Sequence, residues 1–152
     1  MKPGMRSQTM AEKHPALRVT HRFSAPPERV FDAWLDPAKA ARFLFATPAG
    51  EMIRAEIDPR VGGRFVFVDR RNGVDIAHRG EYIEIDKPRR LVFDFAVTGY
   101  EDMLTRVTVA IAPQAEGCEL TLTHDGVLAD FADRTEAGWT MILDTLASTL
   151  AV

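Results

Sequence analysis

Two segments constrain the fold of this chain more than any others: a pair of alternating strands and a long amphipathic stretch at its C-terminal end. The strands cover residues 80–85 and 91–97, joined by the turn Asp86-Lys87-Pro88-Arg89. Both arms follow a two-residue period, which is typical of an antiparallel pair with one apolar face. Residues 127–152 repeat their apolar positions every three or four residues, which predicts a helix with an apolar stripe. Both apolar surfaces need a cover, so the sequence predicts a helix packed on a sheet.

The rest of the chain predicts the other elements of a single α+β domain. Residues 17–23 alternate as a strand, and Ser24 precedes a proline-containing first turn, which predicts a helix capped by that serine. Asp36-Pro37 ends this helix and begins a second one that reaches residue 43 or 44. The chain from Glu51 onward is β, with Asn72-Gly73 at a tight hairpin turn. The expected product is a curved antiparallel sheet of about seven strands with a long C-terminal helix across it.

Length and composition limit the organisation of the chain. With 152 residues, 46% of them hydrophobic, it suffices for one domain with a sizeable core. Residues 1–15 show no apolar period and predict a mobile tail, which leaves residues 16–152 as the domain. The N-terminal segment lacks the apolar centre of a signal peptide, and no apolar run approaches the roughly 20 residues of a membrane span. We therefore expect a cytoplasmic protein without membrane insertion.

The charged and metal-binding residues exclude several classes of function. The 19 basic and 22 acidic residues form no long block of one sign, which argues against a nucleic-acid partner. Cys118 is the only cysteine, so internal disulfides and multi-cysteine metal sites are excluded. The short motifs of nucleotide-binding proteins, zinc peptidases and serine hydrolases are absent. We therefore expect no cofactor. We also expect no metal, because the four histidines lie on separate predicted elements: His14, His21, His78 and His124.

The candidate site is the space between the sheet and the last helix. Alternation places Glu81 on the same face as Ile83 and Ile85, so an inward Glu81 would orient a ligand or act as an acid or base. The alternative is a structural Glu81, paired with an arginine near the strand end. His124 and the aromatic residues likewise fit either a pocket lining or a plain core. The predicted ligand-binding residues are Phe65, Phe67, Glu81, Ile83, Phe93, Phe95, His124, Trp139 and Ile142, and none is assigned as catalytic.

Trp139 is predicted on the inner side of the last helix. Glycine is unfavourable inside a helix, and Gly138 beside the tryptophan suggests that the helix approaches the sheet closely there. The sequence leaves open whether the interior is a cavity or a solid core.

Several sequence blocks carry a resemblance to a known family. They are residues 25–37 (APPERVFDAWLDP), 58–65 (DPRVGGRF), 79–85 with 88–93, and Gly138-Trp139. With this order of elements, the chain resembles the START-like (SRPBCC) superfamily with its helix-grip fold, and more closely the family of the activator of Hsp90 ATPase homologue C-terminal domain. One departure is Phe43, where the second helix of this family usually carries tryptophan.

The resemblance implies a domain that holds a small hydrophobic molecule between sheet and helix, with no universal catalytic residue. Ligand binding without catalysis is the preferred hypothesis. The alternatives are a polyketide cyclase- or hydratase-like enzyme that uses Glu81 or His124, and a protein that docks on a chaperone. A homodimer is compatible with the sequence.

Overall fold

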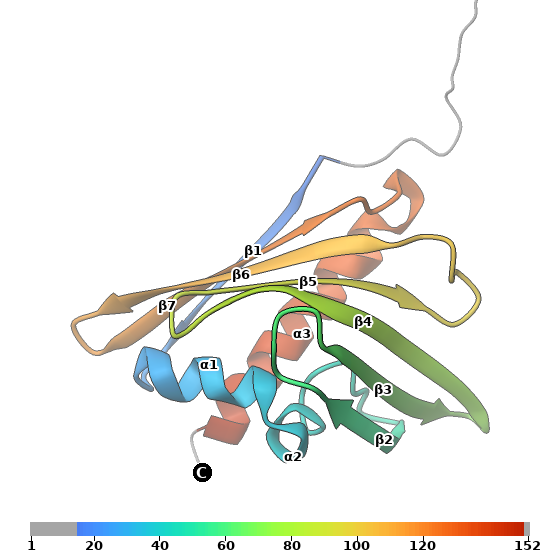
Figure 1. Cartoon of the computed structure of the whole chain (residues 1–152), viewed down its shortest axis with the longest axis horizontal. Coiled ribbons are helices and arrows are strands. Elements are labelled where there is room, and N and C mark those ends of the chain that lie inside the picture. The colour runs from blue at the N-terminus through green and yellow to red at the C-terminus, as the bar shows by residue number, and fades with distance from the viewer. Residues whose placement is uncertain (1–14, 151–152) are drawn as a thin grey trace, which may run out of the picture.

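The computed structural model describes residues 15–150 and contains one seven-stranded antiparallel sheet with three α-helices (Figure 1). The sheet order is β1-β7-β6-β5-β4-β3-β2. The predicted α+β class and helix-grip arrangement are confirmed. The elements are β1 (Leu17–Phe23), α1 (Pro27–Leu35), α2 (Pro37–Ala40), β2 (Glu51–Ile57), β3 (Arg64–Arg71), β4 (Val74–Asp86), β5 (Arg90–Val97), β6 (Thr105–Gln114), β7 (Gly117–Asp125), the 3-10 turn η2 (Ala129–Phe131) and α3 (Ala132–Leu150).

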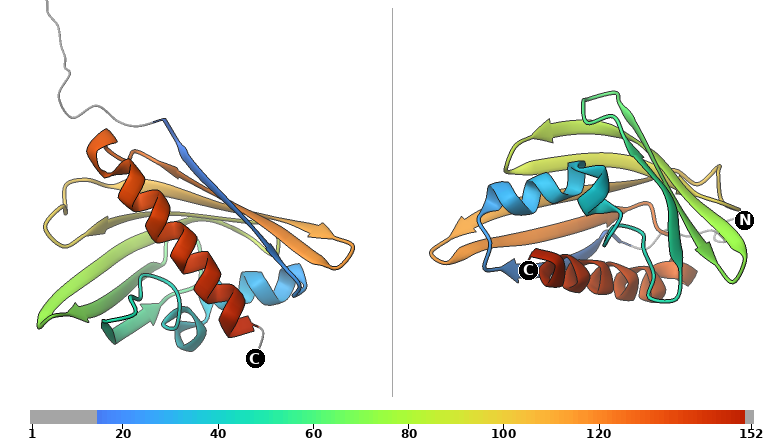
Figure 2. Two further views of the ribbon diagram at one scale, coloured as in Figure 1. Left: turned by 180° about the vertical axis from the view of Figure 1, so that it is seen from behind. Right: turned by 90° about the horizontal axis from the view of Figure 1, so that it is seen from below.

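All three helices lie on the concave side of the curved sheet (Figures 1 and 2). Helix α3 crosses this side diagonally, and the α1–α2 pair covers one end of it. The inner face supplies the fully buried side chains of alternate strand positions, because successive residues of a strand point to opposite faces. Those on the strands with the largest volumes are Phe67, Phe93, Leu91, Leu120, Leu122 and Val107, and they meet Leu143 and Leu146 of α3.

The two short helices begin differently from each other. The N-cap of α1 is Pro26 and no side chain caps this helix, so the predicted capping role of Ser24 is wrong. The start of α2 follows the sequence, because Asp36 accepts hydrogen bonds from the backbone amides of Ala38 and Lys39, at 3.0 and 3.4 Å. This helix ends at Ala40, and hydrogen-bonded turns continue the chain to Leu44.

A β-bulge in β4 reverses the alternation that the sequence suggests. Tyr82 pairs with Phe93, but the next paired residue is Glu84, opposite Val92. The extra residue, Ile83, shifts the strand by one position, so Tyr82 and Ile85 face inward while Glu81 faces outward. The prediction that Glu81 shares the inner face with Ile85 is therefore wrong.

Two glycine-based predictions have opposite outcomes. The Asn72-Gly73 hairpin is confirmed, since both residues have positive φ, 51° and 78°, as a type I′ turn requires. Trp139 is buried on the inner side of α3 as predicted. The close approach inferred from Gly138 is wrong, because a Cβ atom added there would meet no other atom within 4 Å.

Gly80 is the glycine at which strand packing leaves no space for a side chain. It lies between Phe65 of β3 and Phe95 of β5, and an added Cβ would collide with the backbone oxygen of Asp94 and the ring of Phe65. We predict that Gly80→Ala lowers the free energy of unfolding by about 1–3 kcal/mol, because this part of the core is already filled. Urea denaturation measures the change.

Gly138→Ala is the matched control, since the same methyl group enters open space in a helix. We expect it to raise stability by up to about 1 kcal/mol. Equal effects of the two substitutions would contradict the packing described at Gly80.

Candidate functional site

The candidate site is a pocket of about 450 Å³ in the groove between the concave face of the sheet and α3. It lies where α3 begins, at the end of the groove away from α1 and α2 (Figure 2). Its walls come from the end of β3, the facing parts of β4, β5 and β6, the loop after β5, and the connection from β7 into α3. Aromatic and aliphatic side chains dominate the lining, with a few polar groups among them. The lining residues are Arg71, His78, Phe95, Ala96, Val97, Tyr100, Met103, Thr105, Gly126, Val127, Leu128, Phe131, Arg134 and Thr135.

Phe45 fills the groove between this pocket and the α1–α2 end. It lies in the segment between α2 and β2, is 5% exposed, and has a φ of 60°, a left-handed conformation that is costly for a side chain of this size. Its ring stacks on His78 at 4.1 Å between centroids and 9° between planes. The same ring contacts four further aromatic residues: Phe65, Phe67, Phe95 and Trp139. The middle of the interior is therefore solid core, and the open space lies at its edge.

An ion pair between a buried carboxylate and a half-buried arginine holds the segment that carries Phe45. Asp69 of β3 is 1% exposed, and its Oδ2 accepts from Arg71 Nε and from the Thr47 hydroxyl, both at 2.8 Å. Arg71 also donates through Nη2 to the backbone oxygen of Phe45, at 3.2 Å. The carboxylate and the guanidinium thus connect the end of β3 to the backbone of Phe45 and to the side chain of Thr47. This support offsets the unfavourable backbone conformation of Phe45.

His78 presents an uncharged and unpartnered imidazole to the pocket. It is 8% exposed, and its Nδ1 is buried without a hydrogen-bond partner among the described residues. Burial, with a further contribution from the charge of Arg71, lowers the pKa of His78 to about 4, although Asp69 opposes the shift. The imidazole is therefore neutral at pH 7, with one ring nitrogen as a donor and the other as an acceptor.

His124 belongs to a hydrogen-bond chain that ends at the pocket wall. Trp139 Nε1 donates to His124 Nδ1 at 2.9 Å, and His124 Nε2 lies 2.8 Å from the hydroxyl of Thr105. An indole nitrogen can only donate, so Nδ1 is the acceptor and the ring proton is on Nε2. Burial lowers the pKa of His124 to about 4, which keeps the ring neutral. Both ring nitrogens are occupied within the protein.

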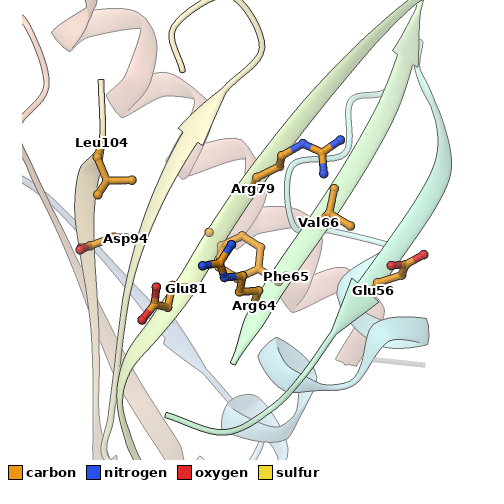
Figure 3. Close-up of a pocket in the computed structure, with 9 residues that line it drawn as sticks. Glu56, Arg64, Phe65, Val66, Arg79, Glu81, Asp94 and Leu104 are labelled. Carbon is orange, nitrogen blue, oxygen red and sulfur yellow. The ribbon is translucent and has the colours of Figure 1, made fainter. Parts of the chain in front are cut away.

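A second hollow, of about 430 Å³, lies on the outer face of the sheet (Figure 3). Five of its nine lining residues are charged: Glu56, Arg64, Arg79, Glu81 and Asp94. Arg54 pairs with Glu56 at 2.9 Å and Arg106 with Asp94 at 2.7 Å, so two of these charges are already neutralised by neighbours. Ligand sites are lined mostly by apolar side chains, and only two of the fourteen residues of the pocket beside Phe45 are charged at neutral pH, Arg71 and Arg134. The pocket beside Phe45 is therefore the better candidate.

The structure divides the nine residues predicted to bind a ligand. Seven are buried on the inner side, but only Phe95 lines the pocket, and the other six belong to the core: Phe65, Phe67, Phe93, His124, Trp139 and Ile142. Ile83 is half-buried at the bulge, and Glu81 is exposed on the outer face. Glu81 therefore cannot orient a ligand inside the groove. His124, with both nitrogens bonded to neighbours, is not placed for acid–base catalysis.

Sequence reasoning missed most residues of the actual pocket. His78 could have been found, because it shares a face with Gly80 and Tyr82 by simple alternation. Arg134, on the first turn of α3, and Phe45 carried no pattern that sets them apart. Residues 15–150 contain no group of three or more His, Cys, Asp or Glu side chains able to hold a metal ion. In the same range no helix is long and apolar enough to cross a membrane.

Comparison with known proteins agrees with this architecture. Residues 24–151 match the family described as Activator of Hsp90 ATPase homolog 1-like protein. The protein CV1439 from Chromobacterium violaceum is 25% identical, with a TM-score of 0.78 over 88% of this chain and 95% of that one. CalU16 from Micromonospora echinospora is also 25% identical, with a TM-score of 0.68 over 88% of this chain and 74% of its own.

An AHSA1-like protein from Aeromonas hydrophila has the same fold, with 24% identity and a TM-score of 0.75 over 88% of this chain and 90% of its own. No curated protein matches the chain.

Phe45→Ala tests whether this ring fills the groove. The variant keeps the left-handed backbone but removes a ring in contact with five others, so we expect a loss of about 3–5 kcal/mol in the free energy of unfolding. Leu104→Ala is the control, because Leu104 is 63% exposed and its removal should change stability by less than about 0.5 kcal/mol. A Phe45→Ala variant as stable as the parent would show that the ring does not pack as described.

The neutral state of His78 predicts a pH dependence of stability. The pKa of His78 is about 4 in the folded protein, whereas the ordinary histidine value of 6.5 applies to the unfolded chain. The unfolded chain therefore binds the proton first as the pH falls. The stability associated with the neutral ring is complete above about pH 6.5 and declines toward pH 4, by about 1.4 kcal/mol per pH unit. His78→Phe keeps an aromatic ring and removes this titration. Between pH 7 and 5 the variant should therefore lose about 2 kcal/mol less than the parent in urea titrations, and parallel profiles would contradict the prediction.

Proposed function

Because the chain belongs to the Activator of Hsp90 ATPase homolog 1-like family, whose members commonly bind hydrophobic ligands, we propose that it binds a small, largely apolar molecule in the pocket beside Phe45. The observation that carries the proposal is the pocket itself. Its volume of about 450 Å³ lies within the usual range for small-molecule sites, about 300–1,000 Å³. Phe95, Val97 and Val127 provide an apolar surface for the body of a ligand.

The polar groups of the pocket support binding over catalysis. His78 is neutral, and the nearby Asp69 carboxylate bonds to Arg71 and Thr47, with no hydrogen bond to the imidazole that would activate it as a base. The cyclase- or hydratase-like alternative relied on Glu81 and His124, and their positions do not favour it. Docking on a chaperone would favour an apolar patch on the outer sheet face, but Asp94 and Arg106 form an ion pair there.

Titration with the neutral fluorescent probe N-phenyl-1-naphthylamine tests the proposal. We expect saturable binding, since the probe is apolar and fits a pocket of this size. Val97→Trp places a large side chain in the pocket wall and keeps a residue that suits a strand, so it should weaken the probe by at least about tenfold.

The matched control is Val61→Trp, which adds the same indole at a residue that is 59% exposed in the turn between β2 and β3. It should leave the affinity unchanged. Failure of the probe to bind the folded parent, or equal binding by all three proteins, would overturn the proposed site.

A further inference from the structure

The polar side chains that line the pocket are unbalanced in charge. Two arginines, Arg71 and Arg134, are among the lining residues, and no aspartate or glutamate is. The charge of Arg71 is offset by its ion pair with the buried Asp69, at 2.8 Å. Arg134 differs, because no ion pair to it is found among the described residues. Arg134 is an exposed residue, and its guanidinium lies 5.3 Å from the centre of the Phe131 ring, a cation–π contact with another lining residue.

Thr105 adds a hydrogen-bond donor of defined direction. Trp139 donates to His124 Nδ1, so the neutral ring keeps its proton on Nε2 and donates it to the Thr105 hydroxyl oxygen. The Thr105 hydroxyl proton must therefore be given to another acceptor, and none is found among the described residues. Since Thr105 lines the pocket, this proton is available to a ligand.

His78 completes a set of groups that lack a partner. Its buried Nδ1 has no hydrogen bond, and leaving such an atom without a partner in the native state is unfavourable. Because this nitrogen is enclosed, a molecule in the pocket does not contact it, and His78 contributes a neutral ring to the lining. The pocket therefore offers an exposed cation without an ion pair, a hydroxyl donor and a neutral imidazole around an apolar interior.

We infer that the natural ligand is a small apolar acid, with its apolar body against Phe95 and Val97, its anionic group at Arg134, and an oxygen atom that accepts from Thr105. Guanidinium groups form short, charge-assisted hydrogen bonds with oxyanions, and Arg134 has no competing carboxylate in the pocket lining. This inference depends on the proposed function, because it names the chemical class of ligand for the same pocket.

A pair of probes with one carbon skeleton tests the inference. N-Phenyl-1-naphthylamine is neutral, and 8-anilinonaphthalene-1-sulfonate is the same skeleton with one anionic group. The measured quantity is the ratio of their dissociation constants, neutral over anionic, in buffer of low ionic strength. We expect Arg134→Gln to lower this ratio by about five- to tenfold through weaker sulfonate binding, with the neutral probe unaffected, and Arg134→Lys to restore part of it.

Arg18→Gln is the matched control for net charge. Arg18 is exposed on β1 with its side chain on the outer face, and its removal should leave the ratio unchanged. The acid inference would be overturned if Arg134→Gln lowered this ratio by less than twofold, or if Arg18→Gln lowered it equally. Val97→Trp must weaken the anionic probe as well, since binding that survives it would place the sulfonate outside the pocket.

Thr105 provides a second, independent measurement. Thr105→Val removes the donor and should weaken the anionic probe by about three- to tenfold, while Thr105→Ser retains the hydroxyl and should bind like the parent. Equal binding by the valine and serine variants would exclude a bond from Thr105. If the neutral probe fails to bind the parent, the proposed function fails. If the neutral probe binds and Val97→Trp blocks it, but Arg134→Gln leaves the ratio of dissociation constants unchanged, only the acid inference fails.

Discussion

The structure depends on one geometric constraint: a single helix is too narrow to cover the sheet that it packs against. Seven strands spaced about 4.8 Å apart extend over roughly 30 Å, whereas a helix with its side chains is about 10–12 Å wide. Helix α3 covers a diagonal strip, and α1 with α2 covers one end. The remaining apolar surface needs another cover. Phe45 provides it in the middle of the groove, and the uncovered part next to it is the pocket.

Covering the groove with a loop instead of a helix explains the buried polar groups. A loop cannot satisfy its backbone through a regular hydrogen-bond pattern, so side chains must do so. Arg71 bonds the backbone oxygen of Phe45, and Asp69 bonds Arg71 and Thr47. The charge of Arg71 adds to burial in lowering the pKa of His78, while the charge of Asp69 opposes the shift. The support of the loop and the chemistry of the pocket are therefore coupled through three strand residues, Asp69, Arg71 and His78.

The candidate site was only partly accessible from the sequence. Alternation correctly placed Phe93, Phe95 and His124 inside, because those strands are regular. The same reasoning failed for Glu81, since the bulge at Ile83 shifts β4 by one residue and nothing in the local pattern marks it. Alternation also could not distinguish a residue of the solid core from a residue that lines the pocket. An inward aromatic residue satisfies the same periodicity whether its ring packs on another ring, as Phe67 does, or faces open space, as Phe95 does.

The sequence by itself determined the α+β class, the order of the elements, the type I′ hairpin at Asn72-Gly73 and the inward position of Trp139. These features follow from local chemistry: side-chain periodicity, backbone conformation at turns, and the burial of an amphipathic helix. Only the tertiary structure decided that Phe45 fills the groove, that Arg134 and Thr105 meet at one pocket, and that Glu81 lies outside. Those outcomes depend on how segments distant in the chain share a limited volume, which no local pattern encodes.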